Sequence, residues 1–137
     1  MLVKRLLRFY RSAEKLNGYL DALIEHVAVQ SGLDTFSRAE KYVERLVALT
    51  ADKEKLGNLW ARLNSVMEGL TDADRVTLYK YADSRVKPAN EADRRETHRA
   101  VVKFTRRAFG ILSGGQEAIK LVNRYYSLMF PSIGGTT

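Results

Sequence analysis

Hydrophobic residues at alternating spacings of three and four form two long series in the first half of the chain. The first series is Leu2, Leu6, Phe9, Ala13, Leu16, Leu20, Leu23 and Val27. The second is Tyr42, Leu46, Leu49, Lys53, Leu56, Trp60, Leu63, Met67 and Leu70. This spacing places each series on one face of a helix, as in a coiled coil. The pattern therefore predicts two long helices packed lengthwise as an antiparallel hairpin.

The periodicity breaks between the two series, at residues 30–36. Gly32 is well suited to end the first helix. Ser37 and Glu40 form a capping box, which predicts that the second helix begins at Arg38. Because the second series continues without interruption, we expect one long helix there rather than two short ones.

Two residues of the second series stand out from the leucines around them. Lys53 is polar, and a polar residue at such a position can fix the register of packed helices at some cost in stability. Trp60 is expected in the core rather than as a platform for a ligand. The same apolar face could also pack against a second copy of the chain, so a homodimer is compatible with the pattern.

The second half of the chain predicts shorter helices. Thr71, three residues before Asp74, is a suitable N-cap for the first of them, and Lys87-Pro88 should stop it, since the residue before proline disfavours helix. Its expected buried residues are Val76, Leu78, Tyr79, Tyr81 and Ala82. Asn90 should cap the next helix, which runs to Leu112.

A last helix is expected over residues 116–129, after a turn permitted by Ser113-Gly114-Gly115. Its expected core-facing residues are Ile119, Val122, Tyr125, Tyr126 and Met129. Taken together, the patterns predict an all-α fold. A long, coiled-coil-like helical hairpin occupies residues 1–70, a small helical bundle that packs with it as one domain occupies 71–130, and a flexible tail occupies 131–137.

The helix expected from Asn90 to Leu112 has one apolar side and one cationic side. The apolar side carries Val101, Phe104, Ala108 and Leu112. Rows of arginine and lysine suit the phosphates of nucleic acid, and arginine can also pair with guanine in the major groove. The candidate nucleic-acid-binding residues are Arg94, Arg95, Thr97, His98, Arg99, Lys103, Arg106 and Arg107.

A second basic row lies on the first helix and could form a further binding face. It consists of Lys4, Arg8, Arg11 and Lys15. The alternative interpretation is that either row binds nothing and is simply the solvent-exposed face of a charged helix. The net charge of +7 at pH 7 favours a polyanionic partner, which could be nucleic acid, an acidic protein or an anionic membrane.

The composition also narrows the classes of function. The chain has 137 residues, the size of one domain. It has no cysteine, which excludes disulfides, thiolate zinc sites and cysteine nucleophiles, and only two histidines. None of the usual catalytic or phosphate-loop spacings is present. We therefore expect a protein that is not an enzyme and that needs no cofactor or metal.

The sequence also bears on location. No apolar run reaches the roughly 18 residues needed to span a bilayer. The arginine-rich start lacks the apolar core of a secretory signal. We expect a soluble, cytoplasmic protein of a bacterial or phage-infected cell.

Two segments resemble a known family. They contribute Leu70, Arg75, Leu78 and Tyr81, and then Thr97, His98, Arg99, Arg106, Arg107 and Ala108. In order and spacing they resemble the ArpU and RinA type of phage transcription regulators, whose C-terminal part is similar to region 4 of sigma-70 factors. The chain departs from that family in the short link from Asp83 to Asn90 and in the tyrosine-rich helix that follows.

The resemblance implies binding to promoter DNA or contact with RNA polymerase. The leading hypothesis is thus a DNA-binding transcriptional regulator that uses its basic helix, with DNA preferred to RNA as the ligand. The alternative is a small helical interaction module or inhibitor, for example phage-encoded, that binds an acidic protein. Membrane binding is disfavoured because the apolar face of the first helix is too regular a packing seam to be left free for lipid.

Overall fold

The computed structural model describes residues 2–33, 39–83 and 85–129, and over these residues the protein is built of helices without strands. The all-α prediction is confirmed. The helices are α1 (Leu2–Leu33), α2 (Ala39–Glu68), α3 (Asp72–Ala82), α4 (Glu91–Arg107), α5 (Phe109–Gly114) and α6 (Gln116–Met129).

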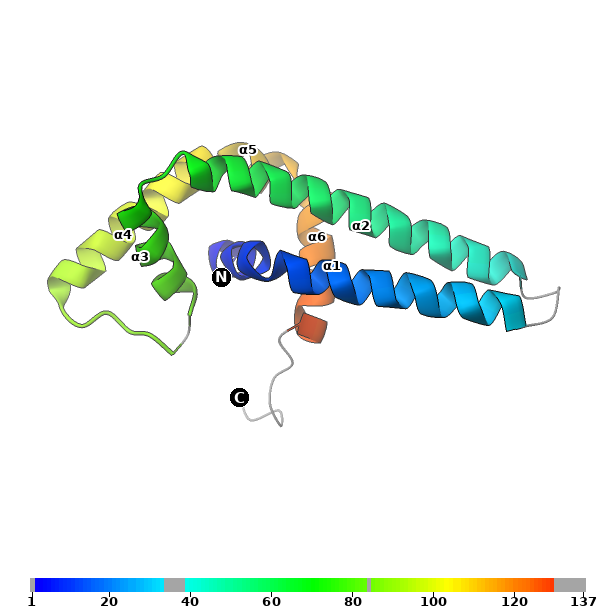
Figure 1. Ribbon diagram of the computed structural model, residues 1–137. Coiled ribbons are helices and arrows are strands. Elements are labelled where there is room, and N and C mark those ends of the chain that lie inside the picture. The colour runs from blue at the N-terminus through cyan, green and yellow to red at the C-terminus, as the bar shows by residue number, and fades with distance from the viewer. Residues whose placement is uncertain (1, 34–38, 84, 130–137) are drawn as a thin grey trace.

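Helices α1 and α2 run antiparallel and pack along their length as the predicted hairpin (Figure 1). The two apolar series supply most of its core. Their buried members are Leu6, Phe9, Leu16, Leu20, Val27, Leu49, Leu56, Leu63, Met67 and Leu70. The prediction that α2 is one continuous helix is confirmed as well.

The ends of the hairpin helices differ in part from expectation. Helix α1 continues to Leu33, so the prediction that Gly32 ends it is wrong. A glycine lowers helix stability by only about 1 kcal/mol and does not by itself stop a helix. The predicted capping box at Ser37 and the start at Arg38 lie outside the described residues, as does the predicted tail over 131–137.

Trp60 was expected in the core, but 37% of its surface is exposed. The interior position is taken by its neighbour Leu59, which is 2% exposed. Because adjacent residues on a helix point about 100° apart, burial of Leu59 turns Trp60 toward the edge of the helix pair. Lys53 also avoids the interior, since its ammonium group pairs with Asp21 of α1.

Both predicted N-caps after the hairpin are confirmed. The Thr71 hydroxyl accepts a hydrogen bond from the Asp74 backbone N–H (3.1 Å) at the start of α3. The Asn90 side chain accepts one from the Asp93 backbone N–H (2.9 Å) at the start of α4. These bonds satisfy amide groups that the first turn of a helix leaves without partners.

Helix α3 is shorter than predicted. It ends at Ala82, so the expected stop at Lys87-Pro88 is wrong. The next residue, Asp83, has an extended backbone, and its carboxylate accepts a hydrogen bond from the Arg85 backbone N–H (3.0 Å), which favours a turn. Val76 was expected to be buried but is 49% exposed on α3.

The long helix predicted from Asn90 to Leu112 is interrupted at Ala108, whose backbone leaves the helical conformation (φ −91°, ψ 7°). Gly110 follows two residues later and weakens the continuation of the helix. The apolar side is otherwise as predicted, since Phe104 and Ala108 are fully buried. Helix α6 has the predicted bounds, and its Ile119, Val122 and Tyr125 are buried, whereas Tyr126 is half-buried.

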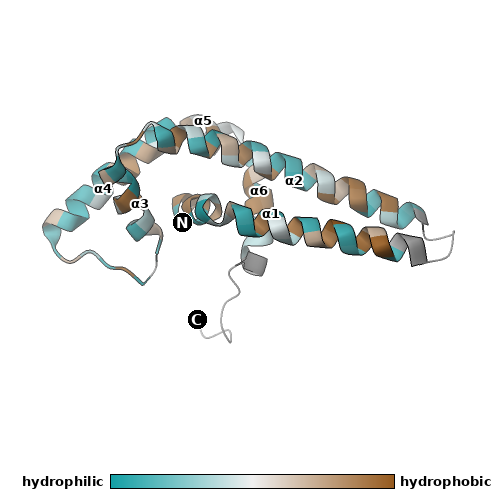
Figure 2. Ribbon diagram, in the orientation of Figure 1, coloured by the Kyte–Doolittle hydropathy of each residue, from teal (hydrophilic) through white to brown (hydrophobic). Residues whose placement is uncertain are grey.

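Helix α6 crosses α1 and α2 near the middle of the hairpin, whereas α3 and α4 lie at the end remote from the α1–α2 connection (Figure 1). Buried residues from every helix form one hydrophobic cluster, so the hairpin and the C-terminal helices share a core. Hydrophilic residues dominate the first half of α4 in Figure 2. None of the described helices is long and apolar enough to span a membrane.

Candidate nucleic-acid interface

The cationic side of α4 lies at the surface. Of the eight residues predicted to bind nucleic acid, all but the half-buried Thr97 are exposed. The opposite side of the helix is anchored by Ala100 and Phe104, which are at most 1% exposed and pack in the core. Helix α4 is therefore held by one face and presents its charges on the other.

Three arginines point most directly away from the core. Arg95, Arg99 and Arg106 follow one another at spacings of four and seven, which places them on one stripe opposite Ala100 and Phe104. The stripe is about 16 Å long at 1.5 Å per residue. We call these three residues the arginine stripe.

The arginine stripe keeps its charge available. None of its guanidinium groups forms an ion pair with a carboxylate among the described residues. Lys103 differs, because its ammonium group donates a hydrogen bond to the Asp74 carboxylate of α3 (3.0 Å). This bond holds the pKa of Asp74 below its ordinary value. Lys103 is thus partly neutralised and helps to fix α4 on α3.

Thr97 and His98 lie on another side of α4, in an open hollow between α3, α4 and the link that joins them. The hollow has a volume of about 720 Å³. Arg94 of α4 and Lys4 of α1 also line it, so one end of the second basic row meets the α4 surface here. Asp83, Asp93 and Glu96 line the same space, which makes its charge mixed.

Three members of the second basic row, Lys4, Arg8 and Arg11, contact other helices of the protein. Lys4 lies over the ring of Tyr81, with 4.8 Å between the ammonium nitrogen and the ring centroid. Arg11 lies over Tyr79, with 4.5 Å from the guanidinium carbon to the centroid. These cation–π contacts hold α1 against α3.

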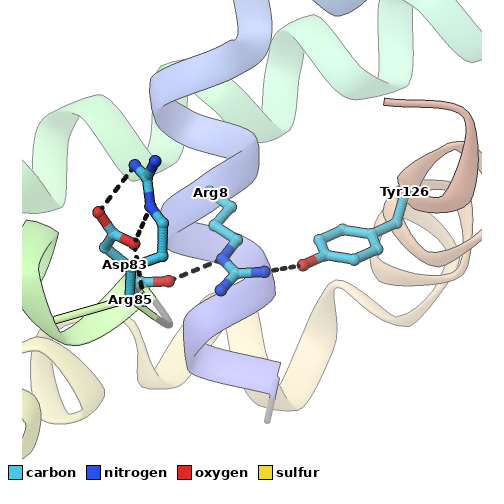
Figure 3. A network of polar contacts seen from close by, with 5 residues as sticks. Arg8, Asp83, Arg85 and Tyr126 are labelled. Atoms are coloured by element: carbon cyan, nitrogen blue, oxygen red, sulfur yellow. Dashed lines mark hydrogen bonds and ion pairs between the residues drawn. The ribbon is translucent and has the colours of Figure 1, made fainter. Parts of the chain in front are cut away.

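Arg8 uses its guanidinium group within the protein, as Figure 3 shows. Its Nε donates a hydrogen bond to the Ala82 carbonyl at the end of α3 (2.7 Å), and its Nη1 donates one to the Tyr126 hydroxyl of α6. Lys15 remains exposed. The structure thus places most of this row against α3 and α6 rather than toward a ligand.

Two surface residues near the arginine stripe were not singled out by the sequence patterns. Arg62 of α2 reaches α5, where its Nη2 would lie 3.7 Å from a Cβ placed on Gly110. Phe109, directly after the end of α4, is 66% exposed. In the continuous helix expected from the sequence, its spacing of three from Arg106 places it near the outward side, and this spacing was the signal available in the sequence. Arg62 adds a cation beside α5, and Phe109 adds an exposed aromatic ring beyond the end of α4.

The part of the chain that the structure describes holds no candidate metal site. It contains no group of three or more histidine, aspartate or glutamate side chains placed to hold a metal ion. The groups of this surface that could bind a polyanion are its cationic side chains and the exposed ring of Phe109. Such groups bind by charge and stacking.

No protein family, no curated protein and no solved structure matches the chain. The resemblance to phage transcription regulators stays a prediction carried by the residues named above.

Proposed function

We propose that the protein is a non-enzymatic regulator that binds duplex DNA through the arginine stripe of α4. One observation carries the proposal: three exposed guanidinium groups lie in line over about 16 Å, without a described carboxylate partner. The net charge of +7 adds long-range attraction to a polyanion. Control of transcription, through promoter DNA or contact with RNA polymerase, is the role that the family resemblance suggests.

The proposed contacts are mainly to phosphates. In a helix-turn-helix motif, a tight turn of about three or four residues positions the recognition helix. Here α3 and α4 are separated by residues 83–90, which is a longer connection. Phosphate contacts fix a protein on DNA but carry no sequence information directly. We therefore propose binding with modest sequence preference, in which Arg95 and Arg99, nearest the start of α4, are the residues best placed to reach a base.

Salt dependence tests this proposal. Affinity for mixed-sequence duplex DNA should fall steeply with salt, with a logarithmic slope of about −0.9 for each phosphate contact. The variant Arg95→Ala/Arg99→Ala should reduce the magnitude of this slope by up to about 1.8. The measurement is a fluorescence-anisotropy titration at several salt concentrations.

A matched control comes from the far end of the hairpin. Lys41 and Arg45 are exposed on α2 and have the same spacing of four. Lys41→Ala/Arg45→Ala lowers the net charge by the same two units and should leave the slope close to that of the parent protein. Equal slopes for the two variants, or no binding by the parent protein, would refute the proposal.

The second candidate function, a helical module that binds an acidic protein, is favoured by exposed apolar residues on α2. Val43 and Val47 are 55% and 65% exposed and one helical turn apart. Nucleic acid that stays bound through purification and is lost in the Arg95→Ala/Arg99→Ala variant supports the first function. A stable protein complex lost on Val43→Ser/Val47→Ser supports the second.

A further inference from the structure

A groove of about 420 Å³ runs along the hairpin between α1 and α2. Its floor is apolar and consists of core residues, among them Phe9, Leu16, Leu20 and Leu56. The volume lies within the range of small-molecule sites, which are typically roughly 300–1,000 Å³. The groove is separate from the arginine stripe, since its lining comes only from α1 and α2.

One end of the groove is aromatic and rigid. The rings of Tyr10 and Trp60 stack with 5.7 Å between centroids and 14° between planes. The indole N–H of Trp60 donates a hydrogen bond to the Tyr10 carbonyl (3.2 Å), and the Tyr10 hydroxyl donates one to the Asn64 side chain (2.6 Å). Because these bonds satisfy the polar atoms, the partly exposed ring of Trp60 offers an apolar surface held in a fixed orientation.

The charged residues of the lining are two cations, Arg11 and Lys53, and one carboxylate, Glu14. Lys53 lies seven residues before Trp60 on α2, which is about 10 Å along the helix. Its ammonium group pairs with Asp21 and has three donors in all, so it can still donate to a second acceptor. Because Asp21 pairs with Lys53 and Glu14 lies in the lining, the charges around this end of the groove nearly balance. An acceptor group would therefore be held there by the remaining N–H donors of Lys53 rather than by net charge.

Gly57 lies between Lys53 and Trp60 on the same side of α2 and leaves the middle of the groove open. A Cβ placed on Gly57 would have no heavy atom within 4 Å. Glycine inside a helix costs about 1 kcal/mol relative to alanine, and no close packing within the chain requires it here. The space beside Gly57 is therefore available to a molecule from outside the chain.

We propose that this groove binds a flat two-ring aromatic molecule that carries a carboxylate. The rings lie against Trp60 and over Gly57, and the carboxylate accepts a hydrogen bond from Lys53. The distance of about 10 Å between these two residues along α2 sets the length of the ligand at two rings and an acid group. The inference does not depend on DNA binding.

The test compares biphenylcarboxylate with biphenylcarboxamide, which has the same shape without the charge. Trp60 is the only tryptophan of the chain, so its fluorescence reports on the groove directly, and calorimetry provides the affinity. The acid should bind the parent protein about two- to fivefold more tightly than the amide, as expected for a partly exposed ion pair. Lys53→Met should remove this preference while both ligands still bind.

Gly57→Leu fills the groove and should weaken binding of both ligands by at least about tenfold, since it occupies the space of a ring. Gly18→Leu is the matched control. Gly18 also has no heavy atom within 4 Å of an added Cβ, but it lies on α1 outside the groove. This variant should bind both ligands as the parent protein does.

Three results would overturn the inference. The first is unchanged binding in Gly57→Leu, and the second is equal affinity of the parent protein for acid and amide. The third is a self-associating parent protein that Gly57→Leu converts to a monomer in sedimentation equilibrium, because a second copy of the chain would then occupy the groove.

Discussion

At the scale of single residues, the contact between Tyr125 and Asp52 shows how α6 is fixed to the hairpin. Tyr125 is 6% exposed, and its hydroxyl donates a hydrogen bond to the Asp52 carboxylate (2.8 Å). Arg124 lies 3.6 Å from the same carboxylate. Burial, together with the bond to Asp52, raises the pKa of Tyr125 to about 12. The folded protein thus favours the protonated phenol.

This pKa shift predicts a loss of stability in alkali. The phenol has an ordinary pKa of 10.0, so its contribution is fully present below pH 10 and is lost as pH rises toward 12. Tyr125→Phe should lower the free energy of unfolding near neutral pH by about 1 kcal/mol and should flatten the alkaline decline. Urea unfolding across this pH range measures both effects.

Tyr19→Phe is the control for this change, because Tyr19 is 40% exposed. Its free energy of unfolding should stay close to that of the parent protein. An alkaline decline that persists undiminished in Tyr125→Phe would contradict the role assigned to the buried phenol.

At the scale of helices, two glycines have opposite effects on stability. A Cβ on Gly18, inside α1, would meet open space. A Cβ on Gly115, the residue that follows α5, would lie 2.8 Å from the Ile111 carbonyl oxygen. The first glycine only weakens its helix, whereas the second permits a close approach of backbone that a side chain would prevent.

Alanine substitutions should separate these two cases. Gly18→Ala should raise the free energy of unfolding by about 0.5–1 kcal/mol, because alanine favours the helix. Gly115→Ala should lower it by roughly 1 kcal/mol or more, because the turn between α5 and α6 must open. Denaturant unfolding measures both changes, and a stabilised Gly115→Ala variant would show that the turn can relax at no cost.

At the scale of the whole molecule, basic residues of α1 join helices that are far apart in sequence. Arg8 bonds to the end of α3 and to α6, as described above. Arg5 donates a hydrogen bond to the Asn123 side chain of α6 (2.9 Å). Both of these α1 arginines therefore hold α6 on the hairpin, and Arg8 also holds α3, which packs against α4.

Loss of Arg8 should therefore loosen the assembly of helices. Arg8→Met keeps the aliphatic stem but removes two hydrogen bonds of a charged donor, each worth roughly 1.5–3 kcal/mol at most. We expect the free energy of unfolding to fall by about 2 kcal/mol and amide hydrogen exchange to rise in α3 and α6. Lys15→Met, an exposed member of the same row, should change neither, and equal stability of the two variants would argue against this role.

The fold could be predicted from the sequence because apolar spacing assigns each helix one buried face. That spacing was enough for the hairpin, for α6 and for the outward direction of the arginine stripe. The N-caps at Thr71 and Asn90 were also predictable, since capping depends on residues within one turn. These features are local, so a single stretch of sequence contains the information for them.

Tertiary structure alone decided which neighbouring faces meet. Periodicity does not say that Leu59 rather than Trp60 turns inward, that Arg8 bonds to α3 and α6, or where two helices leave a groove. These outcomes depend on how the helices cross and on the side chains that each brings to the contact. Thus the sequence by itself determined which side of each helix is buried, and the packing of the helices determined what the remaining sides can bind.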